Sequence, residues 1–161
     1  MKAMQHDLRY EGATIDDVYA MLADPGFREE VCASQHYHRW KVDISPDGDG
    51  MQVRIDQHRP TEGVPSFAHK FVGEEIHIVQ EEEWSSPTAP ADLTVTIPGK
   101  PGHMRGSIRM VEVDGGVTET VHVDIKVAIP LVGGKIEGLI ADLLEHALVA
   151  ENRVGREWLS R

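Results

Sequence analysis

The sequence predicts an α+β fold, in which one curved antiparallel sheet of seven strands packs its concave face against a long C-terminal helix. The first observation is the C-terminal stretch, where a β-like run over residues 121–129 leads through a turn rich in glycine into an amphipathic helix. Apolar residues recur along that helix in steps of three or four, which keeps one stripe facing a core. The stripe consists of Val132, Ile136, Leu139, Ile140, Leu143, Ala147, Ala150, Val154 and Trp158. The second observation is the series of alternating apolar and polar segments that precedes this helix.

Two short helices are expected to interrupt the strand pattern near its start. Residues 4–10 predict an opening strand, and Thr14 then provides the cap of a helix that runs to about Leu22. Asp24 followed by Pro25 repeats this signal, because proline at the first helical position has no N–H left to satisfy. A second helix is therefore predicted over residues 25–34.

Six further strands are predicted after these helices. Residues 40–44 and 51–55 alternate on either side of a Pro-Asp-Gly-Asp-Gly turn, which is typical of a β-hairpin. Segments 75–84, 93–97, 104–113 and 117–129 follow with short connections, so they should pair antiparallel as a meander. Residues 60–65 cannot continue a central strand, and residues 66–72 are expected to form a short helical turn or a loop over an opening. The concave face of the sheet needs an apolar partner, which the last helix supplies, and residues 1–161 are expected to form a single domain.

Composition excludes several classes of function. The chain carries 27 acidic and 16 basic side chains, a formal net charge of -11, so its average field repels polyphosphates and argues against nucleic-acid binding. No apolar run long enough for a secretory signal or a membrane span is visible, so we expect a cytoplasmic protein without stable membrane insertion. The lone Cys32 excludes an internal disulfide, and His36 and His38 have no further ligands at a matching spacing. No metal and no cofactor is expected.

The order of elements resembles the helix-grip fold of the START-like (SRPBCC) superfamily, which includes Bet v 1-like proteins, polyketide cyclases and lipid-transfer domains. Several segments are similar to a more specific group, the uncharacterised actinobacterial DUF2505 family. These segments are Val64-Pro65-Ser66-Phe67, Glu83-Trp84, Ile97-Pro98-Gly99-Lys100-Pro101, Ile129-Pro130-Leu131-Val132-Gly133-Gly134-Lys135-Ile136-Glu137 and Trp158-Leu159. The resemblance implies a cavity between sheet and helix that holds an apolar or amphipathic small molecule. It implies no catalytic residue, because the superfamily shares no common catalytic motif and fold alone does not define function.

Strand parity and the helical stripe predict which residues would line this cavity. The candidates are Val53, Ile55, Gln57, Phe67, Phe71, Ile78, Gln80, Glu82, Trp84, Met104, Ile108, Met110, Gly134, Gly138, Ile136 and Ile140.

Glu82 admits two interpretations. It is either an exposed member of the acidic run 81–83 or a polar group inside the cavity, and a carboxylate buried there needs a donor or has a raised pKa. Trp84 belongs either to the core and rim or to a surface on which a ligand lies.

The glycines at the start of the last helix also admit two interpretations. Gly133, Gly134 and Gly138 each cost a helix roughly 0.5–1 kcal/mol relative to alanine, so something should compensate. They mark either a tight strand-to-helix turn with close packing or the mouth of a cavity, with residues 66–72 as its lid.

Two classes of function follow. The first is a noncatalytic carrier or sensor of a hydrophobic small molecule or lipid. The second is an enzyme of the cyclase, aromatase or hydrolase kind, in which Glu82, Gln57, Gln80 or Tyr37 serves as acid, base or orienting donor. The carrier requires a continuous apolar void with an entrance, whereas the enzyme requires at least two polar groups converging on that void. Ligand identity and oligomeric state are not predicted.

Overall fold

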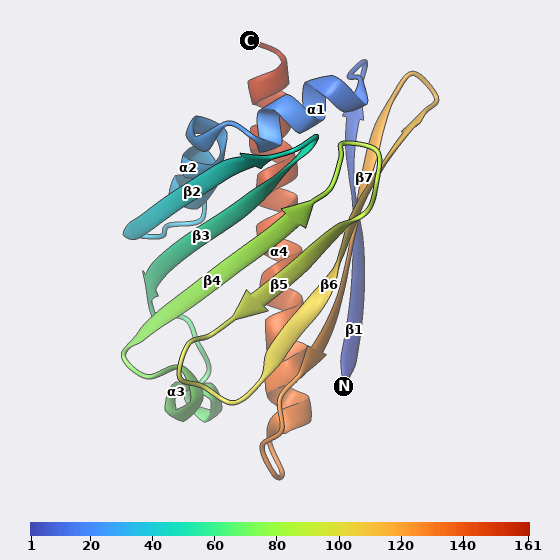
Figure 1. The fold of residues 1–161 in the computed structure, drawn as a ribbon. Helices are drawn as coiled ribbons and strands as arrows, with labels where there is room; N and C mark the ends of the chain where they lie inside the picture. The colour runs from blue at the N-terminus through green and yellow to red at the C-terminus, as the bar shows by residue number, and fades with distance from the viewer.

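The computed structural model describes residues 1–161 and shows one sheet with four helices (Figure 1). The predicted α+β helix-grip class is confirmed. In chain order the elements are β1 (Lys2–Glu11), α1 (Ile15–Leu22), α2 (Pro25–Ser34), β2 (Arg39–Asp47), β3 (Gly50–Pro60), α3 (Ser66–Val72), β4 (Glu75–Trp84), β5 (Ala91–Thr96), β6 (His103–Val113), β7 (Gly116–Lys126) and α4 (Gly133–Leu159).

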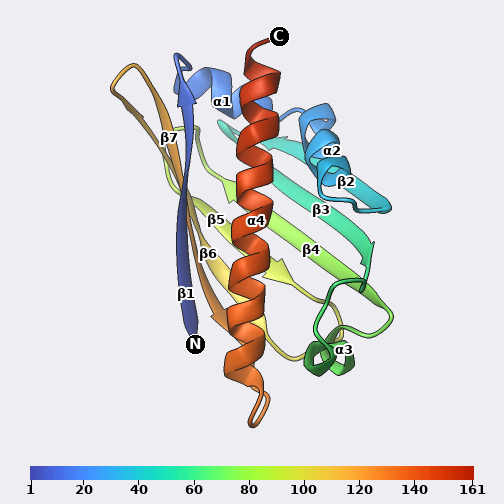
Figure 2. The same ribbon diagram turned by 180° about the vertical axis from the view of Figure 1, so that it is seen from behind.

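All seven strands form one antiparallel sheet in the order β1-β7-β6-β5-β4-β3-β2. Strands β2 to β7 follow one another as a meander, and β1 joins the far edge by pairing with β7. Helix α4 runs along the length of one face of this sheet, with α2 and α3 beside it (Figure 2). It packs most closely against β1 and α2 and less closely against α1 and β7, which leaves the central strands farther from it.

The two short helices begin at the predicted caps. Thr14 Oγ1 accepts a hydrogen bond of 3.1 Å from the backbone N–H of Asp17, whose carboxylate accepts one of 2.9 Å from the N–H of Thr14. Asp24 accepts a hydrogen bond of 2.8 Å from the N–H of Gly26 and precedes Pro25 at the first helical position. These bonds satisfy N–H groups that have no partner inside the helix.

The last strand ends earlier than predicted, at Lys126 rather than residue 129. Its neighbours reach no further, because β1 starts at Lys2 opposite Ile125 and β6 starts at His103 opposite Lys126. The N–H of Val127 instead donates a hydrogen bond of 2.9 Å to the carboxylate of Glu137 in α4. The strand therefore ends where a side chain of the helix replaces the missing strand partner.

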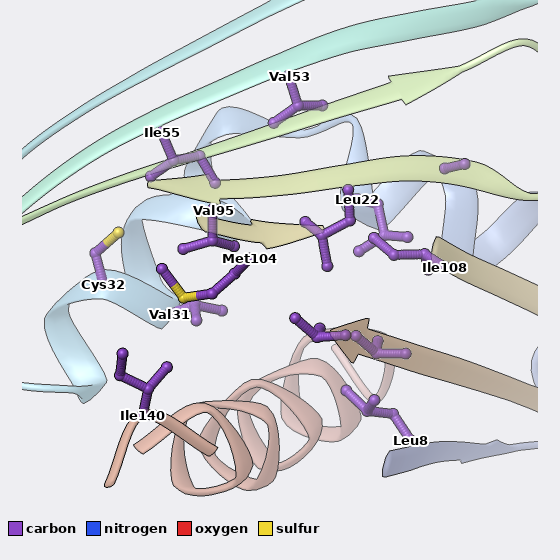
Figure 3. Packing of buried hydrophobic residues seen from close by; sticks show 14 of the residues in the cluster. Leu8, Leu22, Val31, Cys32, Val53, Ile55, Val95, Met104, Ile108 and Ile140 are labelled. Carbon is purple, nitrogen blue, oxygen red and sulfur yellow. The ribbon is translucent and has the colours of Figure 1, made fainter. Parts of the chain in front are cut away.

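The core lies between the concave face of the sheet and the helices. Strand parity holds in β7, since Val121, Val123 and Ile125 are buried while His122 and Asp124 are not. In Figure 3, Val95 and Met104 from the sheet lie on the side of the core toward Ile140 of α4. The middle of α4 is less covered than its ends, because Leu139 and Ala147 are only half-buried and Leu143 is 39 % exposed.

Candidate functional site: a cavity with a charged inner wall

A cavity of about 290 Å³ lies between the central strands and α4. It is bounded by residues of α2, α3, α4 and strands β3 to β7. Hydrophobic residues make up 24 of its 34 lining positions, so most of the wall offers only apolar contact. A space of this kind excludes strongly hydrated molecules and favours apolar ones.

Ten of the sixteen predicted lining residues lie on the wall of this cavity. They are Ile55, Gln57, Phe71, Ile78, Gln80, Glu82, Met104, Ile108, Ile136 and Ile140. Their part in binding a ligand stays a prediction.

The other six predicted residues do not line the cavity. Val53 and Met110 are buried in the core outside it, and Trp84 packs edge-to-face on Tyr19, with ring centroids 5.7 Å apart. Phe67 is 42 % exposed, because α3 buries Phe71 and turns Phe67 away from the core. The remaining two are Gly134 and Gly138.

The glycines at the start of α4 are not among the residues that line the cavity. A Cβ at Gly133 would collide with the carbonyl oxygen of Val127, so Gly133 serves the tight turn, whereas a Cβ at Gly134 or Gly138 would meet no other atom within 4 Å. The exposed residues of the cavity wall are instead Glu62, Gly63 and Leu143. They place the opening between the β3–α3 connection and the middle of α4.

A buried ion pair lies on the wall near α2. The guanidinium of Arg28 donates two hydrogen bonds, of 2.8 and 2.9 Å, to the carboxylate of Glu82, and a third, of 2.8 Å, to the carbonyl of Leu22. Glu82 also accepts hydrogen bonds of 2.6 Å from Gln80 and 2.9 Å from Trp84. Burial alone raises the pKa of Glu82, but Arg28 and these donors hold it below its ordinary value. The interpretation of Glu82 as a buried, partnered carboxylate is thus the one the structure bears out.

Two further carboxyl groups line the cavity beside this pair. Glu119 of β7 is 1 % exposed, and its Oε1 has no hydrogen-bond partner. Glu151 of α4 lies 3.9 Å from the guanidinium of Arg28. Burial raises the pKa of Glu151 to about 7, and it raises the pKa of Glu119 well above its ordinary value, with the negative charges of Glu151 and Glu82 adding to the effect on Glu119. Three carboxyl groups thus face one guanidinium, and burial favours the protonated form of Glu119.

A second group of polar side chains lines the cavity at β3, and it consists of Cys32, Tyr37, Gln57 and Arg59. The thiol of Cys32 lies 3.7 Å from Oε1 of Gln57, and burial raises the pKa of this thiol to about 12. The guanidinium of Arg59 lies over the ring of Tyr37, 5.7 Å from its centroid. At neutral pH the thiol of Cys32 therefore stays protonated.

Sequence reasoning missed three residues of the charged wall: Arg28, Glu119 and Glu151. Each occupies an inward position that the patterns already defined. Glu119 has the same strand parity as Val121, Glu151 lies four residues after Ala147 on the helical stripe, and Arg28 follows the buried Phe27. A charged residue at an apolar position was the available signal.

No group of three or more histidine, cysteine, aspartate or glutamate side chains is arranged to hold a metal ion. None of the helices combines the length and the apolar character that crossing a membrane requires.

Most of the chain matches one known protein family. Residues 5–159 match the family described as "Protein of unknown function (DUF2505)". The chain belongs to the DUF2505 family. An uncharacterized protein of Mycobacterium tuberculosis is 26 % identical to this DUF2505 protein over 123 residues, which cover 73 % of the chain and 70 % of the relative.

Solved structures share the fold of this DUF2505 protein. TTHA0849 from Thermus thermophilus superposes with a TM-score of 0.66 at 16 % identity, over 98 % of the chain and 97 % of its own length. A START superfamily protein from Mycobacterium smegmatis gives a TM-score of 0.60 at 15 % identity, over 94 % and 96 %. The di-domain ARO/CYC StfQ from the steffimycin biosynthetic pathway gives 0.68 at 12 % identity, over 98 % of the chain and half of StfQ. The predicted START-like fold and the DUF2505 resemblance are thereby confirmed.

Proposed function

We propose that this protein is a carrier or sensor of a hydrophobic or amphipathic small molecule, held between the sheet and α4. The observation that carries the proposal is the cavity itself, which is mostly apolar and opens between the β3–α3 connection and α4. Burial of apolar ligand surface there would supply about 25 cal/mol per Å². A cavity with few polar groups on an apolar wall is the usual form of a small-molecule site.

The size of the cavity limits the ligand. Its volume of about 290 Å³ lies at the lower end of the range for ligand pockets. One water molecule occupies roughly 30 Å³ in the liquid, so this volume corresponds to about ten groups of that size, each counted as one non-hydrogen atom. The proposed ligand is therefore a compact molecule or a single short chain rather than a lipid with two acyl chains.

Native mass spectrometry of protein purified without denaturation tests this proposal. The expected result is a fraction with added mass, from which solvent extraction releases one hydrophobic compound. Ala147→Phe, which adds a ring to the cavity wall, should abolish the added mass. Val149→Phe, on the half-exposed side of the same helix and outside the wall, is the matched control and should retain it. Absence of any added mass, together with no binding of neutral hydrophobic probes, would overturn the proposal.

A second candidate function is an enzyme of the cyclase, aromatase or hydrolase kind acting on a hydrophobic substrate. One observation favours it: Glu119 and Glu151 converge on the cavity, and both have raised pKa values. A carboxyl group that holds its proton at neutral pH can act as a general acid. StfQ, which shares the fold, is described as an ARO/CYC of a biosynthetic pathway.

The two candidates predict different fates for the bound molecule. An enzyme converts a hydrophobic polyketone substrate, and Glu119→Gln should slow that reaction by about 10²–10⁴-fold. A carrier releases the molecule unchanged, with the same mass and retention time before and after binding. Unchanged release from both the wild type and Glu119→Gln would leave the carrier as the function.

A further inference from the structure

The charged wall of the cavity discriminates against anionic ligands. Three of the five N–H donors of the Arg28 guanidinium are engaged, by Leu22 and by both oxygens of Glu82. A ligand carboxylate that took the bidentate position on Arg28 would have to displace Glu82, which is itself held by Gln80 and Trp84. It would also approach the carboxyl groups of Glu119 and Glu151. Desolvating a second negative charge close to the ionised carboxylate of Glu82 is unfavourable.

Two buried polar atoms of the lining residues have no partner in the protein, Nε of Arg59 beside β3 and Oε1 of Glu119 on the charged wall. Glu119 is buried among the lining residues, and its Oε1 has no partner. A protonated carboxyl group has one O–H to donate, and a buried donor without an acceptor costs free energy. The wall therefore offers a hydrogen-bond donor at a fixed place in an otherwise apolar space.

We propose that the ligand presents a neutral oxygen acceptor, the carbonyl of a ketone or ester or the oxygen of an alcohol, to Glu119, whose carboxyl group donates a hydrogen bond to it. This inference rests on the proposed function, because it assigns the polar group of the ligand that the cavity holds. A cationic amine is the less favourable occupant, since the guanidinium of Arg28 already lies 3.9 Å from Glu151. The apolar remainder of the ligand then lies toward Met104 and Ile140 of the wall.

A series of ten-carbon probes tests the inference: decane, 2-decanone, 1-decanol, decanoate and decylamine. Their affinities are measured by isothermal titration calorimetry. One hydrogen bond should make 2-decanone bind about tenfold more tightly than decane. Decanoate should bind more weakly than 1-decanol.

Variants at Glu119 separate a hydrogen bond from the apolar contact. Glu119→Gln keeps a donor and should keep the preference for 2-decanone over decane, whereas Glu119→Leu should bring the ratio close to one. Val113→Leu, on the exposed end of β6 and outside the wall, should leave the ratio unchanged. Binding of decane and 2-decanone with equal affinity to the wild type would overturn the assignment of Glu119 while supporting the carrier function. Failure of every neutral probe to bind would count against both.

A measurement on the wild-type protein keeps the test independent of whether Glu119→Leu folds. The infrared stretching band of 2-decanone labelled with ¹³C at its carbonyl should move to lower frequency on binding, relative to a hydrocarbon solvent. A band at the hydrocarbon position would overturn the proposed hydrogen bond. Tightest binding by decylamine would show instead that the carboxyl groups hold a cation.

Discussion

Arg28 and Glu82 form a doubly hydrogen-bonded ion pair, with bonds of 2.8 and 2.9 Å, on side chains that are each 2 % exposed or less. Removal of one partner leaves the other charge buried without compensation, which costs about 3–5 kcal/mol. We therefore expect Arg28→Met to lower the free energy of unfolding by about that amount. Urea denaturation followed by tryptophan fluorescence measures the loss.

The control for Arg28→Met is an arginine of the surface. Arg39 contacts Glu75 at 2.6 Å, but its side chain is 61 % exposed, so Arg39→Met should change the free energy of unfolding by no more than about 1 kcal/mol. Equal effects of the two substitutions would contradict the structural importance of the buried pair.

The second prediction concerns pH. The folded pKa of Glu119 is raised above its ordinary value of 4.5, so the unfolded chain releases this proton first as the pH rises. Stability from this group is present below about pH 4.5 and is lost as the pH rises toward the folded pKa, by at most about 1.4 kcal/mol per pH unit. Glu151 acts in the same direction up to about pH 7, whereas Glu82, with a lowered pKa, loses its contribution as the pH falls.

Glu119→Gln isolates this effect, because glutamine keeps the shape and cannot ionise. Among the groups facing Glu119 are Arg28, Glu82, Glu151 and Tyr10, all of which the variant retains. Between about pH 5 and pH 8, urea denaturation should show a shallower fall in stability than in the wild type, and the variant should be the more stable protein at pH 8. Glu145→Gln, on the exposed side of α4, is the control. Parallel pH profiles for the wild type and Glu119→Gln would refute the prediction.

The third prediction separates the glycines at the start of α4. Gly138 lies inside the helix with room for a Cβ, so Gly138→Ala should stabilise the protein by about 0.5–1 kcal/mol. Gly133→Ala should destabilise it, because the new methyl group would collide with the carbonyl oxygen of Val127. Thermal unfolding of the two variants should shift in opposite directions. A loss of stability in Gly138→Ala would show that this glycine has a packing role that its surroundings do not reveal.

The fold could be predicted almost completely from the sequence because its signals are local. Alternation, turn residues and caps gave strands and helices close to their observed bounds, including the capping box at Thr14 and the start of α2 at Pro25. The end of β7 was missed because it depends on Glu137, which is ten residues away from the N–H of Val127 that it binds. Such a bond depends on how the helix folds back, and a periodic pattern contains no information about it.

The candidate site was predicted only in its apolar part. Ile55 and Met104 followed from strand parity and Ile140 from the helical stripe, because each is an apolar residue at an inward position. Arg28 and Glu119 are polar residues at inward positions. Only the three-dimensional structure shows that Glu82 of β4 pairs with Arg28 and that burial raises the pKa of Glu119. The two interpretations of the glycines could not be separated for a related reason: a glycine removes a side chain, but whether a void results depends on residues of other elements.

Slow labelling of Cys32 is the fourth prediction. The thiol lines the cavity, 2 % of the residue is exposed, and burial raises its pKa to about 12. At pH 8 the thiolate fraction is then on the order of a thousandfold lower than for a free cysteine, so iodoacetamide should label the native protein at least that much more slowly than the urea-unfolded chain. A neutral hydrophobic ligand in the cavity should slow labelling further, as measured by mass spectrometry. A cysteine placed at the exposed Ser160 by Ser160→Cys should react at the unfolded rate with or without ligand. Fast labelling of native Cys32 would mean that the cavity opens more widely than the structure describes.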